Sequence, residues 1–530
     1  MISTAMCQAQ TRLPPVGTNE QALPAPRSDQ KPTRLPAPPA PAKPESIPLS
    51  TESAPAPALA KSVENSLVNR DVCPSMDWQH DDDFSPLQTG LSPWFHDLAT
   101  EQSVYDDKRA VPTQRPLLEL GRDWYGSGLN PPSETWLGPT NLVQQQLYVY
   151  GDFRTGIGSG RNADGTFNNW ASRLNLDVDY RLTGTERFHA FFGPLNRVTD
   201  FTRFEREDGS FDYLSFYNLN PVTAFFEGDA GALFGGATGT PSPKEMPFTA
   251  GLVPLLFQNG VWMEDAVSGA AFAIPAQHSR LLNWSNFDAT FFAVFDQINS
   301  PAFGADNHAA QAFGTAWFID AYGGYIETGY AYLNDIAGQN RSYHNSTFSF
   351  TRRYFDKISN SVRIIVNSGQ DLPKNQRTAN GALLLVENSL VTPEPLRVIP
   401  YFNFFAGWDR PQSVARAGVA GGVLRNTGLN FEIDGLNGFP TLDATGADTA
   451  GGSVGIDLIG ANFDRQWIVE GTYLTPHGDR AFVKGNEYAL GTRYQFAISH
   501  CTIIRMDAMY GWRENDRDLN GVRLEYRWKF

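Results

Sequence analysis

The sequence has little cysteine, no excess of basic residues and no long apolar run. Cys7, Cys73 and Cys501 are the three cysteines among 530 residues, and they show neither paired spacing nor a metal-ligand pattern. We therefore expect no disulfide framework, no metal site and no cofactor. The formal net charge is −15. This charge argues against a nucleic-acid partner, because binding to phosphates requires a basic surface.

No segment approaches the roughly 18 uninterrupted apolar residues of a transmembrane helix. The mean hydropathy of −0.34 is typical of a soluble protein. This average does not exclude a membrane β-barrel, because half of each barrel strand faces water. An aromatic content of 13% and 48 glycines favour short strands, tight turns and aromatic residues at membrane interfaces.

A convincing secretory signal is also missing. Residues 1–9 lack the basic start and the apolar stretch of such a signal. Cys7-Gln8-Ala9 could be the remnant of a signal-peptide cleavage site whose upstream part is not in this sequence. Thr4-Ala5-Met6-Cys7 matches a lipoprotein box only loosely, because Met6 stands where a small residue is expected.

Proline is concentrated at the amino-terminal end, where thirteen of the 36 prolines precede Ala60. Such a segment forms neither a helix nor a packed core, so residues 1–60 are predicted to be a disordered or polyproline II spacer. Residues 61–140 are mixed in composition and contain Trp78, Trp94, Trp124 and Trp136. We expect them to form a partly ordered entry segment before the main domain, residues 141–530.

The final residues alternate without error. Apolar and charged side chains occupy opposite faces of a strand, because strand side chains have a period of two. The apolar face consists of Val522, Leu524, Tyr526, Trp528 and Phe530. With this face the segment resembles the closing strand of bacterial outer-membrane β-barrels, which typically ends in an aromatic residue. The resemblance implies that the apolar face is a signal read by the barrel-assembly machinery, and that the 1–60 spacer and the 61–140 entry segment lie in the periplasm. The alternative is the last strand of a soluble β-sandwich.

Similar alternating segments recur upstream. The clearest is 173–182, where odd positions are polar and even positions are apolar or aromatic. The signal weakens between Gly193 and Asn283, where three or four strands fit. The total is therefore 16 or 18 strands. The other predicted strands are 143–153, 172–182, 186–193, 284–296, 313–321, 323–333, 345–355, 360–367, 382–391, 396–407, 453–461, 465–474, 487–497 and 502–511.

The connections between these strands alternate between long and short. Counting back from Phe530, long links such as 475–486 and 408–452 alternate with short ones such as 498–501 and 462–464. Near the front, a long loop over 155–170 precedes a tight turn at 183–185. Long outer loops and short periplasmic turns are expected of an outer-membrane barrel. The order places both ends in the periplasm and requires an even number of strands.

The polar positions of the clear strands should face the lumen. A barrel of 16 or more strands is too wide for side chains to fill, so a water-filled channel is expected. Charges of both signs suit small polar solutes, although the same charges could simply pair with one another. The predicted pore-lining residues are Arg173, Asp177, Asp179, Arg181, Arg187, Asp288, Glu327, Arg363, Arg493, Arg505, Asp507, Arg523, Glu525 and Arg527.

Two glycine-rich segments, 231–248 and 408–452, are candidates for loops folded into the pore. Both could instead be mobile surface loops, and we prefer this second interpretation for 408–452.

Two other functions are compatible with a membrane barrel. Outer-membrane phospholipases are barrels that use a His, a Ser two residues later and an Asn. His344-Asn345-Ser346 has this spacing on the lipid-facing side of a predicted strand, but no Asn is clearly placed as the orienting partner. The other alternative is a non-transporting barrel that acts as an anchor, adhesin or receptor.

The sequence therefore predicts an all-β, transmembrane, antiparallel up-and-down barrel in a bacterial outer membrane. Its expected function is passive diffusion of small polar solutes, without enzymatic activity. The expected partners are outer-membrane lipids, the barrel-assembly machinery and the solutes. A homo-oligomer is a family expectation, since porins are often trimeric.

Overall fold

The computed structural model describes residues 116–121, 133–135, 138–141, 145–197, 199–207, 210–240, 242, 244–418, 421–425, 427, 435–460 and 463–530. The expectations for residues 1–115, including the proline-rich spacer and the signal remnant, lie outside these residues.

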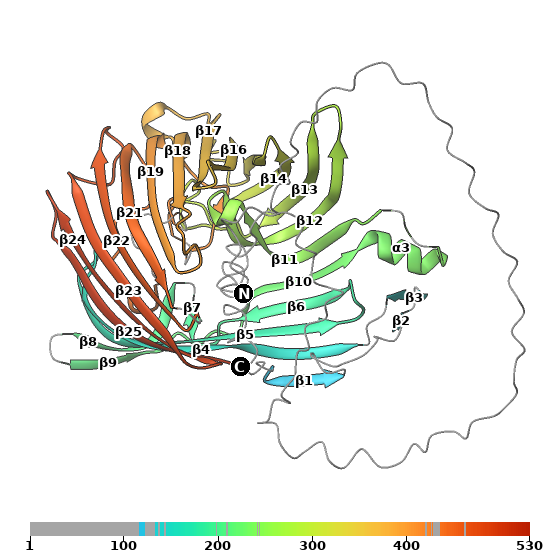
Figure 1. Cartoon of the computed structure of the whole chain (residues 1–530), viewed down its shortest axis with the longest axis horizontal. Helices are drawn as coiled ribbons and strands as arrows, with labels where there is room; N and C mark the ends of the chain where they lie inside the picture. Colours follow the sequence, from blue (N-terminus) through green and yellow to red (C-terminus); the bar gives the residue numbers. More distant parts are fainter. Residues whose placement is uncertain are drawn as a thin grey trace, which may run out of the picture. The chain divides into compact units, whose positions relative to one another are not determined.

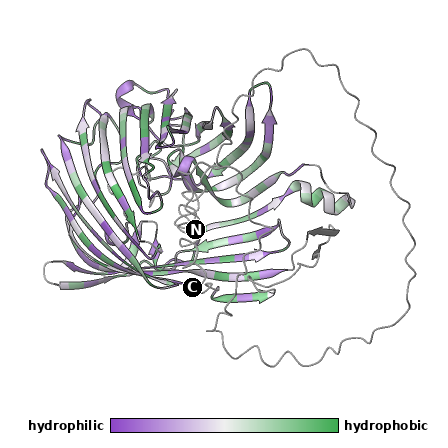
Figure 2. Ribbon diagram, viewed as in Figure 1, coloured by the Kyte–Doolittle hydropathy of each residue, from purple (hydrophilic) through white to green (hydrophobic). Residues whose placement is uncertain are grey.

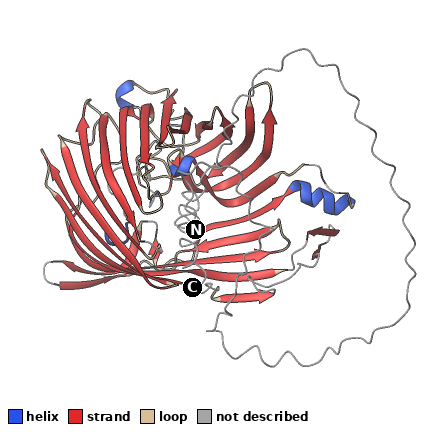
Figure 3. Cartoon of the chain, viewed as in Figure 1, coloured by secondary structure: helices blue, strands red, loops and turns tan. Residues whose placement is uncertain are grey.

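Strands dominate the described chain (Figure 3). The strands are β1 (Leu118–Gly121), β2 (Ser133–Thr135), β3 (Gly138–Asn141), β4 (Gln146–Arg161), β5 (Thr166–Arg181), β6 (Arg187–Phe192), β7 (Asn196–Arg197), β8 (Asp200–Glu207), β9 (Ser210–Leu214), β10 (Pro221–Asp229), β11 (Pro247–Phe257), β12 (Met263–Ser279), β13 (Trp284–Asp296), β14 (Ala310–Ala321), β15 (Gly324–Asp335), β16 (Tyr343–Tyr354), β17 (Ile358–Ser368), β18 (Asn380–Leu390), β19 (Val398–Arg410), β20 (Ala415–Arg416), β21 (Thr449–Ile459), β22 (Arg465–Pro476), β23 (Glu487–Ser499), β24 (Thr502–Arg513) and β25 (Leu519–Lys529). The helices are α3 (Ala230–Thr238) and the 3-10 turns η3 (Gln258–Gly260), η4 (Lys374–Gln376) and η6 (Gly435–Asn437).

Within the described residues, eighteen strands form one closed antiparallel ring: β4 to β6, β10 to β19 and β21 to β25 (Figure 1). The ring closes where β25 pairs with β4, from Asn520↔Arg161 to Lys529↔Asp152. The predicted barrel is thus confirmed, with the larger of the two strand numbers. Closure also excludes the β-sandwich.

The closing seam is extended by a strand from the preceding segment. Phe530 and Gly151 exchange backbone hydrogen bonds of 2.8 and 3.0 Å. Beyond this point β1 pairs with the same edge of β4, from Leu118↔Val149 to Gly121↔Gln146. The same edge of β4 is therefore covered first by β25 and then by β1.

The links divide as expected into a turn side and a loop side. Turns such as 322–323, 355–357 and 500–501 lie on the side of Phe530, and long links such as 369–379 and 411–448 lie on the other side. One sequence prediction is wrong. Residues 155–170 are not a long loop, because β4 and β5 continue through them and leave only 162–165 as the turn.

The segment 231–248 does not fold into the pore. It forms α3 on the turn side, where Figure 1 shows the helix projecting beyond the ends of β10 and β11. The Asp229 side chain caps its first turn by accepting from the Ala232 amide at 2.8 Å, and Gly239 ends the helix at φ 68°. Phe234 is exposed. The pore-loop prediction is wrong because a capped helix satisfies this backbone without the barrel wall.

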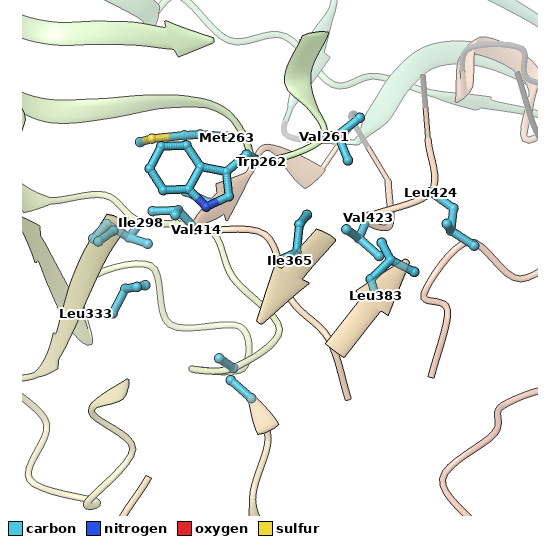
Figure 4. Packing of buried hydrophobic residues seen from close by; sticks show 14 of the residues in the cluster. Val261, Trp262, Met263, Ile298, Leu333, Ile365, Leu383, Val414, Val423 and Leu424 are labelled. Atoms are coloured by element: carbon cyan, nitrogen blue, oxygen red, sulfur yellow. The ribbon is translucent and has the colours of Figure 1, made fainter. Parts of the chain in front are cut away.

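The main apolar cluster lies inside the ring. Figure 4 shows Trp262 and Met263 beside Ile298, Leu333 and Val414. Ile365 and Leu383, from the neighbouring strands β17 and β18, face Val423 and Leu424 of the 411–448 link in the same view. This packing fixes the link against the inner wall.

Candidate functional site

The barrel wall has an apolar outer face and a polar inner face, which Figure 2 shows as alternating colours along the strands. On β25, Val522, Leu524, Tyr526 and Trp528 are between 39% and 57% exposed. The alternate residues Arg523 and Glu525 are 3% and 1% exposed. Four of the five residues predicted to form the assembly signal therefore lie on the outer face. The fifth, Phe530, is partly buried at the seam.

Aromatic side chains mark both ends of the outer face. Trp170, Tyr488 and Trp512 are exposed near the loop ends of their strands, and Trp467 and Trp528 are exposed near the turn ends. Two such girdles around an apolar band are the pattern of a transmembrane barrel.

All fourteen predicted pore-lining residues lie on wall strands and are buried or partly buried. They fall into three clusters, and each cluster spans neighbouring strands.

The first cluster lies on β23, β24, β25 and β4. Asp507 binds Arg493 (Nε to Oδ1, 2.8 Å) and Arg523 (Nη2 to Oδ2, 2.8 Å). Glu525 binds Arg523 (3.0 Å), Arg527 (3.1 Å) and Arg154 (2.7 Å). Arg154 was missed from the sequence because the strand was predicted to end at residue 153.

Arg505 differs from its neighbours in this cluster. Its Nε donates to Gln495 Oε1 at 3.1 Å. In the described part of the chain, no carboxylate lies within ion-pair distance of it. Among the arginines of this cluster, Arg505 therefore has the least neutralised charge.

The second cluster lies on β4, β5, β6 and β10. Asp179 accepts from Tyr150 (2.7 Å) and contacts His189 Nδ1 (2.9 Å) and Arg187 (3.6 Å). Arg187 also binds Glu227. Asp177 lies 3.4 Å from His189 Nε2. His189 was missed, although strand alternation places it two residues from Arg187. Arg173 and Arg181 lie over the rings of Phe201 and Tyr148.

The third cluster lies across the ring on β13, β15, β17 and β18. Arg363 lies between Glu327 (3.6 Å) and Glu387 (3.2 Å) and is almost fully buried. Asp288 accepts from the Ala276 amide at 2.7 Å. Asp288 and Glu327 also line a small cavity of about 90 Å³ beside Gln258. Carboxylates dominate here, whereas arginines dominate the first cluster.

The 411–448 link, called the insert below, is attached to the inner wall at one end. Ser413, Val414 and Ala417 bond to the backbone of Val261, Trp262 and Glu264, and β20 pairs in parallel with the start of β12. Arg416 and Glu264 form an ion pair of 3.4 Å that is nearly inaccessible.

The far end of the insert reaches β4 and β5. Asn437 Nδ2 donates to Gly156 O (2.8 Å) and to Asn169 Oδ1 (2.7 Å), and Asn169 Nδ2 donates to Asn437 O (3.0 Å). A Cβ at Gly156 or Gly158 would come within 2.8 Å of Asn437. The wall is thus shaped to receive the insert.

The preferred interpretation of 408–452 as a mobile surface loop is therefore wrong. Its described residues cross the interior from β12 to β4, because their apolar side chains find partners on the inner wall. A cavity of about 300 Å³ remains between the insert and the wall. Its lining includes Asn169, Arg203, Glu205 and Asn437.

The phospholipase-like set does not come together. His344 and Ser346 are exposed on the outer face, and His344 Nδ1 is hydrogen-bonded to Tyr330 at 2.7 Å. Asn345 faces the interior, where it accepts from Trp262 Nε1 (2.9 Å) and donates to Gln412 O (2.9 Å).

Neither a metal-binding cluster nor a membrane-spanning helix is found among the described residues. No cluster of three or more His, Cys, Asp or Glu side chains there is placed to hold a metal ion. No helix among these residues is long and apolar enough to span a membrane.

No protein-family model matches the sequence, and no curated protein matches it. Several solved structures do. Acinetobacter baumannii OccAB4 aligns with a TM-score of 0.50 and 9% identity over 74% of this chain and 100% of that chain. Pseudomonas aeruginosa OpdK with vanillate aligns with a TM-score of 0.49 and 11% identity over 72% and 98%. The outer membrane protein OpdK from the same organism gives 0.46 and 10% over the same shares.

At these identities the likeness is one of fold, and OccAB4 carries it. Together with the apolar exterior and the charged interior, it confirms the expected membrane β-barrel. The chain has the fold of a closed, eighteen-stranded antiparallel transmembrane β-barrel.

Proposed function

We propose that this barrel is a channel for passive diffusion of small polar solutes across a bacterial outer membrane. The observation that carries the proposal is the closed ring of eighteen strands with charged residues inside. A ring of this size has an interior wider than wall side chains alone can fill. Outer-membrane lipids would contact the apolar band.

The insert would set the width of the path. It is attached at β12 through Arg416 and at β4 and β5 through Asn437, so it crosses the interior. Selectivity would then depend on solute size and on the space that the insert leaves free.

The wall charges would act on solutes that pass the insert. The arginine-rich cluster around Arg505 and the carboxylates Glu327 and Glu387 lie on different parts of the ring. Charged groups that line a pore set its preference among ions. Opposed charges of this kind suit small polar and zwitterionic solutes.

We also propose that the chain has no catalytic role. His344 and Ser346 share the outer face, but His344 Nδ1 is hydrogen-bonded to Tyr330 and not to an Asn, which supports this. The assembly machinery as a partner, the homo-oligomer and the pore-lining roles of the fourteen residues stay predictions.

The test is single-channel recording of the refolded chain in planar bilayers, with liposome swelling in neutral sugars of increasing size. We expect stepwise openings that scale with salt concentration and a sharp limit in sugar size. A barrel that shows heat-modifiable migration but no conductance and no swelling would contradict the proposal and favour an anchor, adhesin or receptor.

A further inference from the structure

The barrel wall is not hydrogen-bonded over its full height between β10 and β11. On the turn side, β5 pairs with β6 through Leu176–Arg181, and on the loop side it pairs with β8 through Asn169–Ser172. β8 and β9 thus continue the wall where β6 and β10 end. However, β10 pairs with β11 only from Ala224↔Leu252 to Asp229↔Pro247.

Above that point the wall has two separate edges. We call residues 215–223 and 253–257 the lips of a lateral seam. Both segments are described, and no backbone hydrogen bond between them is found in the structure. The first lip is held from its other side, where the Asn218 amide donates to Pro194 O and the Phe216 amide donates to Thr202 Oγ1, both at 3.1 Å. The second lip is held by β12, with which β11 pairs from Phe248↔Phe272 to Phe257↔Met263.

One proline opposes closure of the seam. The Ala230 amide donates to Met246 O, so alternate pairs of the β10–β11 ladder are hydrogen-bonded, and in the continued register the next such pair would be Val222 and Pro254. Pro254 has no N–H to donate, so this pair would lack one of its two hydrogen bonds. The register of β10 also shifts between Pro221 and Thr223. The open seam is therefore encoded in the sequence.

In a barrel whose long loops face outward, the seam would lie at the depth of the outer leaflet. A membrane-spanning strand needs about 9–11 residues. β11 runs from Pro247 on the turn side to Phe257, so its lip is the loop-side half of the span. The lip is roughly 16 Å long at about 3.3 Å per residue.

The surroundings of the seam are uncharged, and apolar side chains lie there beside the polar residues Ser215, Asn218, Asn220 and Thr223. Neither lip contains a charged residue. Leu219 and Tyr217 are 77% and 64% exposed on one lip, and Leu256 is 40% exposed on the other. Behind the second lip, Val253 and Leu255 belong to the interior apolar cluster.

We propose that this seam is a lateral port through which a hydrocarbon chain passes between the outer leaflet and the apolar sector of the barrel interior. The proposal requires the barrel to span a membrane but does not depend on aqueous diffusion. A β-strand from a second copy is the other conceivable occupant, and Pro254 disfavours it because it removes a donor from the edge of β11.

Photolabelling of the full chain in liposomes tests the port. A phospholipid and a free fatty acid, each with a diazirine near the end of its acyl chain, are used separately, and labelled residues are mapped by mass spectrometry. We expect label at the inward-facing Val253 and Leu255 as well as at the outward-facing Leu524. Leu383, which faces inward where β18 is paired on both sides, is the control and should stay unlabelled.

The two probes distinguish the source of the chain. Inner label from both indicates a seat for membrane lipid, and inner label from the fatty acid alone indicates a port for single-chain solutes. Label at Leu524 without any at Val253 or Leu255 would overturn the port while leaving the membrane barrel intact. Loss of label at Leu524 as well would contradict the membrane barrel itself.

Proline variants provide the matched test. Pro254→Val restores the missing donor and should abolish the inner label relative to Leu524. Pro400→Val, on β19, should leave the inner label unchanged. Unchanged labelling in Pro254→Val, or a disulfide between Cys variants of Leu219 and Leu256 on two separate copies, would overturn the proposal.

Discussion

Arg523 and Asp507 face each other on β25 and β24, with Nη2 2.8 Å from Oδ2 and neither side chain exposed. Asp507 also holds Arg493 at 2.8 Å. Removing this one carboxylate would take an ion-pair partner from two arginines of the inner wall, although Glu525 would still hold Arg523 at 3.0 Å.

Asp507→Ala is therefore expected to destabilise the barrel by about 3–5 kcal/mol, the usual cost of breaking a buried ion pair. The measurement is urea unfolding followed by heat-modifiable migration. Lys484→Ala removes an exposed partner of Asp516 and should leave the unfolding midpoint unchanged. Equal effects of the two variants would contradict this prediction.

Gly156→Val should loosen the insert and raise single-channel conductance. Even a Cβ at this position would lie 2.8 Å from Asn437 Oδ1, so the hydrogen bonds of Asn437 to the wall would be lost. Those two bonds are worth about 1–3 kcal/mol together. Gly471→Val is the control, because a Cβ there would lie 3.9 Å from Ala489 O, an ordinary van der Waals distance. Unchanged conductance in Gly156→Val would exclude the insert as the constriction.

Acidification should hold the insert more firmly. Burial raises the pKa of Asp443 in the insert above its ordinary value of 3.8, against the opposing hydrogen bonds from Thr445. A carboxyl with a raised pKa in the folded state contributes stability that is full below the ordinary pKa and is lost as the pH rises through the folded pKa. We expect conductance to fall as the pH is lowered through that window. Asp443→Asn should flatten the profile, and an unaltered profile in this variant would contradict the assignment.

Arg505→Ala should make the channel less favourable to anions. Its guanidinium bonds to Gln495 and not to a carboxylate, so its loss removes a charge from the wall without leaving an unpaired acid. The measurement is the reversal potential in a salt gradient, which should shift toward cation preference. Arg465→Ala, in an exposed pair with Asp464, should cause no shift.

Phe530→Ala should slow the formation of folded barrel. The aromatic side chain packs beside Trp528, with ring centroids 5.0 Å apart, where the pairing of β25 with β4 closes the ring. The measurement is the rate at which the heat-modifiable form appears in vesicles. Lys529→Ala retains the aromatic side chain and should fold at the normal rate. Normal folding of Phe530→Ala would weaken the assembly-signal prediction.

Strand alternation made the barrel predictable, because lipid and water impose opposite demands on successive residues. The 173–182 pattern and the final strand were recognised in this way, and both lie in the ring. The failures have physical causes. Glycines 156, 158 and 160 interrupt the alternating pattern of β4, so the sequence predicts a loop for its second half.

The insert could not be placed from its own composition. Its glycine-rich sequence is compatible with a surface loop, and its position depends on distant partners such as Asn169 and Glu264. The ion pairs could not be predicted from the sequence either, because alternation gives the face of a residue and not its neighbour on the next strand. Arg154 became visible only once β4 was known to pair with β25.

The pairing of β25 with β4 has a consequence for how the molecule is made. Arg154 and Glu525 meet across that pairing although 371 positions separate them along the chain. Bringing such remote edges together carries a large entropic penalty before any contact repays it. Until then, both edge strands display unsatisfied amide and carbonyl groups that invite aggregation. Biogenesis must therefore keep a half-built sheet shielded while its two ends search for each other.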